Sequence, residues 1–529
     1  MNDHLDTLKR SLIGGQIDRR GFMTGALAFG VGLSMASSAL AQAEKATPKQ
    51  GGTLRVGFLQ GSTSDSFDPA TYNNDFMFVT NYAVFNHLTE FAPGGAIAPE
   101  LAESFEAEPG AKVWTFKLRK DVEFSDGKKL TAADVLASID YHRGEDSKSA
   151  VKPVLAQIAE MKASDDHTVV FTLTTGNADF PYIFADYHLC VKQAVDGKID
   201  PMSRIGTGGY VVESFEPGVR IKLKRRESYW KEGRAHFEQV EITTISDTAA
   251  RMNALMTGQV DVVDRPDLKT IHLLKRAPGV RVETTSGTLH YTMPMHVNTP
   301  PYDNRDVRTA LKLAINREEL VDKILRGYGT VGNDHPVAKS MPFFDATIEQ
   351  RAYDPEKAKF HLKQAGLSSL DVQLFTSEAA FEGAVDASLL YAEQAKKAGI
   401  NIEVVRQPSD GYWSNVWLVK PFCTSYWGGR PTPDWMFTAG YSKDAEWNDT
   451  KWQNERFNAL LLEARAEIDQ NKRAEMYSEM QRLCRDDGGA LIPMFGQYVF
   501  ALRDQVQHGE LSEQWNLDSL RFVERWWMA

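Results

Sequence analysis

The chain has 529 residues, of which 42% are hydrophobic and 25% charged, and its formal net charge is −11. This is the composition of a folded globular protein, and two or three lobes are expected because a single hydrophobic core stops growing near about 250–300 residues. The acidic balance, without any long run of Lys or Arg, argues against a nucleic-acid partner.

The N-terminus has the pattern of a targeting segment. The pair Arg19-Arg20 precedes an apolar run over residues 26–40, which ends in the A-x-A cleavage signal Ala39-Leu40-Ala41. The run is too weakly hydrophobic for a membrane span of about 20 apolar residues, and no later run qualifies. The twin arginine resembles a Tat export signal, and an ordinary secretory signal is the alternative. We therefore predict that residues 1–41 are a signal peptide and that the mature protein is soluble and periplasmic. No cysteine near the cleavage site could carry a lipid anchor.

Strands and helices follow one another along the mature chain. Residues 51–59 read as the first strand, and residues 76–91 as a helix with one apolar face. Strict alternation over 114–118 predicts a half-buried strand. Thr131 with Asp134 three positions later is a capping-box pattern that begins the next helix.

The second part of the chain repeats the strand–helix–strand order. Asp354 and Pro355 begin a helix as N-cap and first helical residue, and Gly366 ends it. The other predicted elements are a strand at 167–176, a hairpin at 209–230, a strand at 240–245, helices at 247–258 and 305–325, a strand at 371–377, a helix at 386–399 and a strand at 400–407. This order predicts an α/β fold.

The sequence contains no complete catalytic motif. Ser149-Ala-Val-Lys152 fits S-x-x-K, but the companion motifs S-D-N and K-T-G are absent, so a solvated helix end is the better interpretation. Asp65 and Asp68 could act as paired carboxylates, yet both are good turn formers in a loop. No nucleophile elbow, metalloprotease motif, P-loop or dinucleotide fingerprint is present. We predict no catalytic residues and no enzyme.

A metal site and a disulfide are also not predicted. The segment His290 to His296 contains soft ligands, but strand alternation would spread them over two faces. The three cysteines, Cys190, Cys423 and Cys484, match no zinc spacing, and we interpret them as small buried hydrophobes. We therefore predict no cofactor.

One stretch, "TSYWGGRPTPDWMFTAGY" from Thr424 to Tyr441, does suggest a binding site. Six of the eleven tryptophans fall within forty residues around it: Trp413, Trp417, Trp427, Trp435, Trp447 and Trp452. The pair Gly428-Gly429 would let a ligand approach the backbone, and Arg430 offers a planar fork for a carboxylate or phosphate. Apolar walls with a few placed polar groups are typical of ligand pockets. The alternative is an aromatic core patch with a snorkelling arginine.

Several segments resemble one family, in family order and across nearly all of the mature chain. They are "GGTLRVG", "LTEFAPGGAIAPELAESFE", "WTFKLRKDVEFSDGKKLTAADVLASI", "GTGGYVVESFEPGVRIKLKRRESYW", "RMNALMTGQVDVV", "NTPPYDNRDVRTALKLAINREELVDKIL" and "YDPEKAKFHLKQAG". The family is the extracellular solute-binding proteins, family 5, of peptide, opine and nickel ABC importers.

The resemblance implies a bilobal periplasmic-binding-protein fold, hinge-closing and of three domains. After the signal peptide, the implied parts are lobe I from 42–85, 205–292 and 497–529, an extra domain from 86–204, and lobe III from 293–496, which carries the Trp-rich loop. It also implies a binding protein that catalyses nothing. Such a protein traps a small organic solute and delivers it, as a monomer, to an ABC permease driven by an ATPase.

The resemblance also suggests where the solute binds. In the dipeptide- and oligopeptide-binding branches of the family, the corresponding stretch resembles W-x-G-D followed shortly by D-P-D. The first Asp of that stretch pairs with the free amine of the peptide. In this chain Arg430 occupies the position of the amine-binding Asp, and Asp434 matches the final Asp of D-P-D. The reversed charge predicts an anionic or zwitterionic solute, because an ammonium beside Arg430 would be repelled. The predicted ligand-binding residues are Arg430, Trp427, Tyr426, Gly428, Gly429, Trp413, Trp435 and Asp434, with Ser64, Asp65 and Phe67 from the loop of the other lobe.

Two alternatives remain open on the same scaffold. Relatives carry nickel bound to a chelator, and Arg430 could hold the carboxylates of such a chelator. A ligand-binding protein for a chemoreceptor is also compatible with the sequence.

Overall fold

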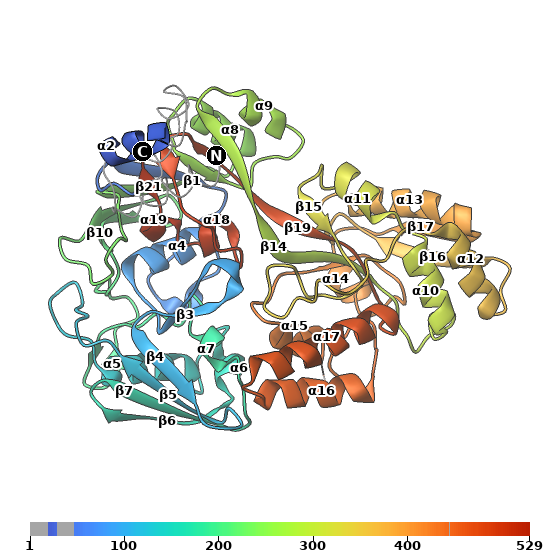
Figure 1. The fold of residues 1–529 in the computed structure, drawn as a ribbon, viewed down its shortest axis with the longest axis horizontal. Coiled ribbons are helices and arrows are strands. Elements are labelled where there is room, and N and C mark those ends of the chain that lie inside the picture. The colour runs from blue at the N-terminus through green and yellow to red at the C-terminus, as the bar shows by residue number, and fades with distance from the viewer. Residues whose placement is uncertain (1–18, 29–46, 444) are drawn as a thin grey trace.

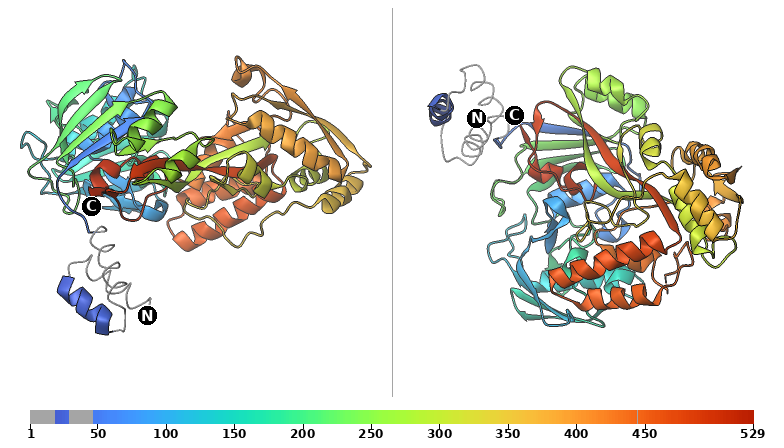
Figure 2. Two further views of the ribbon diagram at one scale, coloured as in Figure 1. Left: turned by 90° about the horizontal axis from the view of Figure 1, so that it is seen from above. Right: turned by 45° about the vertical axis from the view of Figure 1, so that its right-hand side comes forward.

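The computed structural model describes residues 19–28, 47–443 and 445–529, so the cleavage signal at 39–41 lies outside the described residues. The molecule has two halves joined by two long strands, β14 (Val280–Pro294) and β19 (Ala490–Arg503) (Figure 1). Figure 2 shows the same two-part arrangement from two further sides. Among the described residues no helix combines the length and hydropathy needed to cross a membrane.

Lobe I is built on one wing of a nine-stranded sheet. The order β10-β11-β12-β1-β13 leads into β19 and β14, with β1 parallel to both of its neighbours. Buried side chains of these strands form one core with the helix α4 and the C-terminal segment. The elements are β1 (Thr53–Phe58), α4 (Asp75–Val84), β10 (Tyr210–Glu216), β11 (Arg220–Arg225), β12 (Gln239–Thr244), α8 (Thr248–Met256), β13 (Val262–Asp264), α9 (Ile271–Arg276), β20 (Val506–Gln507), α18 (Asn516–Ser519), α19 (Phe522–Arg525) and β21 (Trp527–Met528).

The extra domain has its own four-stranded sheet, in the order β4-β5-β7-β6, and its own apolar core. Side chains of β5 alternate between buried and partly exposed, as the sequence predicts. Thr131 and Asp134 form the expected capping box of α5. The elements are β2 (Thr89–Phe91), β3 (Ile97–Pro99), β4 (Ala102–Ala107), β5 (Val113–Leu118), α5 (Ala132–Arg143), α6 (Lys152–Leu155), β6 (Ile158–Asp165), β7 (Thr168–Leu173), α7 (Phe180–Ile183), β8 (Ala194–Val195) and β9 (Lys198–Ile199).

Lobe III packs helices on the other wing of the long strands and on a parallel pair, β16-β17. Asp354 caps α12 through its side chain, with Pro355 first in the helix. The elements are α10 (Arg305–Leu313), α11 (Arg317–Lys323), β15 (Gly329–Val331), α12 (Pro355–Gln364), β16 (Leu370–Thr376), α13 (Ala384–Ala395), β17 (Ile400–Arg406), α14 (Tyr412–Asn415), β18 (Ser425–Trp427), α15 (Pro433–Gly440), α16 (Glu455–Ala466) and α17 (Gln470–Asp486).

The crossing strands carry an irregularity where they leave lobe I. The register of β14 against β19 is regular from Val280 to Ser286, shifts, and resumes at His290. At the shift, a Cβ on Gly287 would lie 2.4 Å from the carbonyl oxygen of Gly496, so the two backbones approach too closely for a side chain. Such a bulge bends a strand locally. The crossing strands are therefore bent at this point.

The halves meet again at the far side of the molecule, where the extra domain touches helices α16 and α17 (Figure 1). Ala178 donates its backbone N–H to the carbonyl oxygen of Arg465 at 2.7 Å. Beside it the buried side chains of Asp179 and Arg473 form an ion pair. We call these two contacts the clasp. The chain thus closes a ring whose sides are the crossing strands and the clasp.

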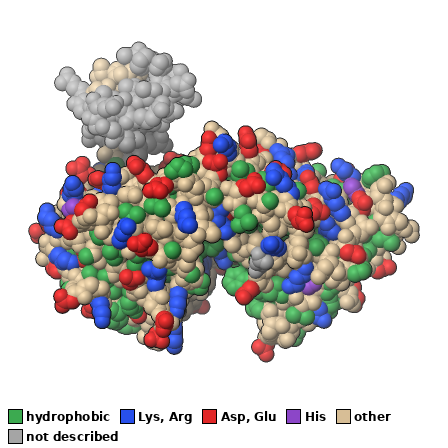
Figure 3. Space-filling model, turned by 90° about the horizontal axis from the view of Figure 1, so that it is seen from below, with side chains coloured by type: hydrophobic (Ala, Val, Ile, Leu, Met, Phe, Trp, Pro, Cys, Tyr) green, Lys and Arg blue, Asp and Glu red, His purple; other side chains and the backbone are tan. Residues whose placement is uncertain are grey.

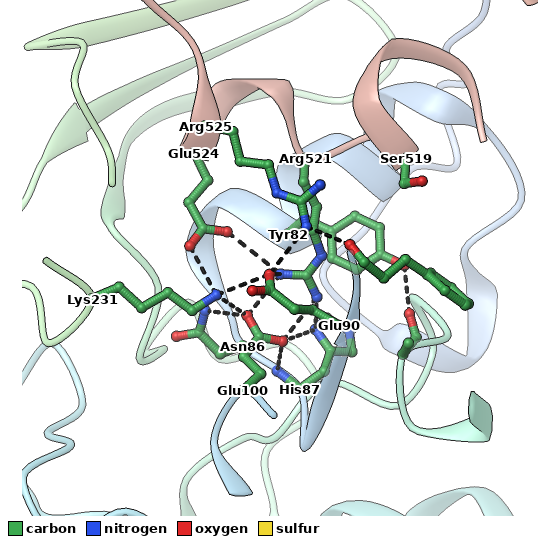
Figure 4. A network of polar contacts seen from close by, with 12 residues as sticks. Tyr82, Asn86, His87, Glu90, Glu100, Lys231, Ser519, Arg521, Glu524 and Arg525 are labelled. Atoms are coloured by element: carbon green, nitrogen blue, oxygen red, sulfur yellow. Dashed lines mark hydrogen bonds and ion pairs between the residues drawn. The ribbon is translucent and has the colours of Figure 1, made fainter. Parts of the chain in front are cut away.

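A buried network of charged side chains joins lobe I, the extra domain and the C-terminal segment (Figure 4). Arg521 donates to both carboxylate oxygens of Glu100, at 2.7 and 2.8 Å, and Lys231 donates to the same group at 2.7 Å. Lys231 also pairs with Glu90 and Glu524. Burial alone would raise the pKa of Glu100, but Arg521 and Lys231 outweigh it and hold that pKa below its ordinary value. The three glutamates lie close enough to hold a metal ion, but each is already paired with Lys or Arg.

Two local predictions can be compared directly with the structure. The helix expected over 76–91 is wrong in its second half, because α4 ends at Val84 and the chain then becomes extended. Phe85 belongs to the core of lobe I and Leu88 to that of the extra domain, so the chain passes between domains here. The three cysteines are buried and free, as predicted. The domain boundaries stay a prediction.

The network gives a first test. Arg521→Met should lower the free energy of unfolding by about 3–5 kcal/mol, because it leaves buried carboxylates with one cation fewer. The measurement is urea unfolding at neutral pH. The control is Arg456→Met, which removes a solvent-exposed pair with Glu479 and should cost less than about 1 kcal/mol. Equal losses in the two variants would contradict the importance of the buried network.

Candidate functional site

The Trp-rich loop is held between an edge strand and a helix. Strand β18 pairs with β14, so that His290 faces Trp427 and Tyr291 faces Tyr426. The loop then crosses Gly428, Gly429 and Arg430 before α15, whose N-cap Thr432 accepts a hydrogen bond from the backbone N–H of Trp435. Both ends of the loop are therefore fixed by regular structure.

The two glycines have different roles. A Cβ on Gly429 would lie 1.4 Å from Oγ1 of Thr288, in the irregular part of β14, so only glycine fits at this position. A Cβ on Gly428 would meet nothing within 4 Å. Gly429 thus permits the close approach of the loop to the crossing strand. Gly428 borders open space, where a side chain would meet no neighbouring atom.

Arg430 has no carboxylate partner among the residues that the structure describes. Its Nη1 donates to the carbonyl oxygens of Gly428 and Gly429 at 3.0 and 3.1 Å. Burial lowers the pKa of Arg430, and nearby Tyr187 opposes that shift. An arginine stays cationic under such conditions, so the guanidinium presents a positive charge that the protein leaves uncompensated.

Tyr187, which lies near Arg430, belongs to an aromatic group. The ring of Tyr187 stacks on Phe78 with centroids 3.6 Å apart, and Trp515 lies edge-on at 6.2 Å. Both neighbours pack against the core of lobe I. Arg430 of lobe III therefore lies near Tyr187, a member of this aromatic group of the other half. The space-filling view shows a deep notch between the halves (Figure 3).

Trp427 is a core residue and does not form an exposed wall. It is only 5% exposed and packs in the cluster beneath α15, α16 and α17. Its indole N–H donates to Asp449 at 3.3 Å, and that of Trp417 donates to the same carboxylate oxygen at 3.2 Å. Burial raises the pKa of Asp449 to about 6. This carboxylate fixes two tryptophans under the loop.

Trp413 and Tyr426 instead present aromatic surface to solvent. They are 40% and 43% exposed, and their rings meet edge to face with centroids 5.6 Å apart. Trp447, 47% exposed, lies over Trp417 and Trp427. These three side chains can stack on a solute without leaving the folded structure.

Trp435 and Asp434 lie elsewhere, on a cavity between the extra domain and lobe III. The cavity has a volume of about 210 Å³. Its lining residues come from both halves: Pro153, Val154, Gln157, Thr175, Asn177, Asp179, Tyr182, Ile183, Thr432, Asp434, Trp435, Thr438 and Arg465. Asp434 accepts from Nε of Arg465 at 3.1 Å, and burial raises the pKa of Asp434 to about 6.

The three candidates from the loop of lobe I serve mainly to build that loop. Asp65 is buried and accepts from the backbone N–H of Ser62 and the side chain of Asn74, at 2.8 and 2.7 Å. Phe67 lies in the core, edge-on to Phe215. Ser64 is exposed and hydrogen-bonds Ser62. Of the three, only Ser64 has a side chain open to solvent.

Sequence reasoning missed the residues that lie beside the glycine loop and around Tyr187. Tyr187, Phe78, Trp515 and Thr288 stand in four separate segments, and none belongs to a motif. Nothing in their local pattern distinguishes them from other aromatic or hydroxyl side chains. Only the fold brings them together.

Comparisons with known proteins agree on one group. The family model for bacterial extracellular solute-binding proteins, family 5 (Middle), matches residues 96–449. Di/tripeptide-binding protein 1 of Pseudomonas aeruginosa (strain UCBPP-PA14) is 26% identical over 467 residues, covering 81% of this chain and 86% of that protein. The dipeptide-binding protein of Escherichia coli (strain K12) is 26% identical over 495 residues, covering 85% and 91%.

Solved structures share the fold at lower identity. HbpA2 from Haemophilus parasuis superposes with a TM-score of 0.79 at 21% identity, covering 88% of this chain and 99% of that one. A nickel ABC transporter protein from Bacillus halodurans gives 0.75 at 23%, covering 90% and 98%. AgaA from A. tumefacien R10, in complex with agropinic acid, gives 0.68 at 23%, covering 90% and 99%.

The glycine pair supplies a matched test of the loop geometry. Gly429→Ala should lower the free energy of unfolding by about 1–3 kcal/mol, because the new methyl group overlaps Thr288. Gly428→Ala, with open space at its Cβ, should change it by less than about 0.5 kcal/mol. Chemical unfolding of both variants decides the matter. If the Gly429→Ala variant were as stable as the Gly428→Ala variant, the claim that the loop backbone approaches β14 too closely for a side chain would be wrong.

Asp449 gives a prediction about pH. The pKa of Asp449 is raised from 3.8 to about 6, so the folded state binds the proton more tightly than the unfolded state does. Protonated Asp449 therefore stabilises the fold at low pH, and this contribution is lost as the pH rises through about 6. Asp449→Asn removes that titration. Relative to wild type, the variant should gain about 2 kcal/mol of unfolding free energy between pH 4 and pH 7.5. The exposed control Asp140→Asn should show no such gain, and a pH-independent difference for Asp449→Asn would refute the prediction.

Proposed function

The chain belongs to the bacterial extracellular solute-binding proteins, family 5, and from this premise we propose that it is the periplasmic component of an ABC importer for an organic solute with an anionic group. The solute would bind between the lobes with its carboxylate or phosphate on Arg430. Members of this family are binding proteins for transport and not enzymes.

The observation that carries the proposal is the uncompensated guanidinium of Arg430. Its hydrogen bonds go to backbone carbonyls, and no Asp or Glu of the described part of the chain pairs with it. Arg430 is partly buried. A partly desolvated cation without a counter-ion is costly, and an anionic ligand that supplies the counter-ion recovers part of that cost. The planar fork of arginine also suits the two oxygens of a carboxylate.

The surroundings support a solute of this class. Exposed aromatic faces at Trp413, Tyr426 and Trp447 give contact area at low entropic cost. The irregular crossing of β14 and β19 supplies a point at which the halves could open and close. A free ammonium at the position of Arg430 would be repelled. Opines and modified peptides therefore fit better than plain dipeptides, and among the similar structures AgaA is described in complex with agropinic acid.

The partners follow from the family. We expect a monomer that the twin-arginine segment directs to the Tat export route. The exported protein docks on a permease driven by a separate ATPase. The nickel–chelator alternative requires the same arginine, with the chelator's carboxylates on it. Metal analysis of the protein after solute is bound separates the two hypotheses. A stoichiometric transition metal would favour the nickel–chelator alternative over a metal-free organic solute.

The test uses residues 42–529, unfolded and refolded to remove bound solute. Thermal shifts are measured with plain dipeptides and with the same dipeptides acetylated at the amine. At 100 times its dissociation constant a ligand stabilises by about 2.7 kcal/mol. We expect the acetylated set to bind at least as well as the free set, and Arg430→Gln to weaken binding at least about tenfold, which is a loss of about 1.4 kcal/mol.

Arg406→Gln, an exposed arginine at the end of β17, is the matched control and should bind as wild type does. Stabilisation by free-amine dipeptides alone, unaffected by Arg430→Gln, would contradict the proposal. The protein would then be a peptide-binding protein that holds the amine at another carboxylate.

A further inference from the structure

Tyr187 is fixed in place by the helix α4 of lobe I. The side-chain amide of Asn81 donates to the backbone carbonyl oxygen of Tyr187 at 2.9 Å. The hydroxyl of Tyr82 donates to the carbonyl oxygen of Ala185 at 2.8 Å. The ring of Tyr187 lies on that of Phe78, with centroids 3.6 Å apart. The hydroxyl group of Tyr187 therefore has a defined position before any solute binds.

This hydroxyl group has no hydrogen-bond partner among the described residues, and its oxygen keeps some surface open to solvent. Burial, with smaller effects of the carboxylates of Asp186 and Asp75, raises the pKa of Tyr187, so that its hydroxyl keeps the proton and can donate. Both carboxylates are already paired, Asp186 with His188 at 2.7 Å and Asp75 with Arg265 at 2.8 Å. The hydroxyl is thus free to donate to an acceptor of a ligand.

Trp515 supplies a second donor beside Tyr187. Its ring lies edge-on to that of Tyr187 with centroids 6.2 Å apart, and its indole N–H has no acceptor among the residues described. Shortly after it, residues 517–520 all have positive φ, between 49° and 63°, which is unfavourable for residues that carry a Cβ. Asp518 holds this turn by accepting from Nη1 of Arg525 at 2.9 Å. Backbone strain of this kind is common at binding sites, and here it fixes the chain next to Trp515.

Arg430 completes a group of donors that come from three segments of the chain. Its Nη1 donates to backbone carbonyls, but its Nε and Nη2 have no acceptor among the described residues and stay open to solvent. The guanidinium lies close enough to Tyr187 for each group to influence the ionisation of the other. By contrast, the buried indole donors of Trp417 and Trp427 both reach Asp449. A cluster of donors without acceptors suits an anion, which offers acceptors only.

We propose that Tyr187 is a second ligand of the solute's anionic group. Its hydroxyl donates to the carboxylate or phosphate that Arg430 holds, and Trp515 closes the site from the C-terminal segment. The inference rests on the proposed function, in which the anion of the solute lies on Arg430. A carboxylate accepts from all of these donors, whereas a neutral amide turns an N–H toward one of them. The site therefore selects a free carboxylate over its amide, and the bound anion connects lobe III to the other half.

The test uses refolded residues 42–529 with N-acetyl dipeptides that carry a free C-terminal carboxylate, each paired with its C-terminal amide. Calorimetry gives the ratio of the two affinities within each variant, so a general loss of stability does not affect the comparison. We expect wild type to prefer at least one carboxylate about tenfold or more over its amide. In Tyr187→Phe, which keeps the ring on Phe78 but removes the hydroxyl, this preference should fall at least about threefold. Tyr353→Phe is the matched control, because the hydroxyl of Tyr353 donates to Gln394 within lobe III, and it should keep the wild-type ratio.

The outcomes separate the inference from the proposed function. Loss of the preference in both Tyr187→Phe and Arg430→Gln, with the control unchanged, supports the inference, because a merely structural ring would serve equally well without its hydroxyl. If Tyr187→Phe keeps the preference and Arg430→Gln loses it, the hydroxyl is not a ligand, and the inference fails while the proposed function stands. If Arg430→Gln also keeps it, or if wild type binds no acetylated dipeptide or binds each acid and its amide equally, the proposed function fails and the inference fails with it.

Discussion

The crossing of β14 and β19 is the constraint on which the rest of the molecule depends. A fourteen- or fifteen-residue strand spans nearly 50 Å at about 3.4 Å per residue, so the same two strands can belong to both halves. Lobe I and lobe III are two wings of one sheet, and the glycine loop leaves that sheet beside the irregular part of the crossing. The clasp closes the other side. Arg430 lies on that loop, near Tyr187 of the other half.

Charge is distributed differently at the two kinds of interface between the parts. Where lobe I meets the extra domain, Glu90, Glu100 and Glu524 each pair with a Lys or Arg of the protein. Where lobe III meets the other half, pairing is incomplete, because Arg430 lacks a counter-ion and Asp179 has an oxygen without a donor among the described residues. In the proposed function, the counter-ion of Arg430 comes from the solute.

Local signals in the sequence predicted much of the fold. The capping box at Thr131 and the N-cap at Asp354 depend on residues a few positions apart, and both formed as expected. The helix over 76–91 failed because its end is decided by distant groups: the backbone N–H of His87 donates to Glu100, which itself pairs with Arg521. The candidate site divides in the same way. The composition of the stretch from Thr424 to Tyr441 identified the loop around Arg430. Tyr187, Trp515 and Asp179 come from remote segments, which local patterns do not link to this loop. Trp427 points inward because strand alternation and its hydrogen bond to Asp449 place it in the core.

The most direct test of the account is the identity of the solute that the protein selects. Refolded protein and its Arg430→Gln variant would each be equilibrated with a small-molecule extract, separated from it by gel filtration and unfolded, and the released compounds identified by mass spectrometry. The account predicts that wild type enriches a compound with a carboxylate or phosphate, and that the variant does not. Equal enrichment of the same compound by both proteins, or enrichment of an uncharged compound, would contradict it.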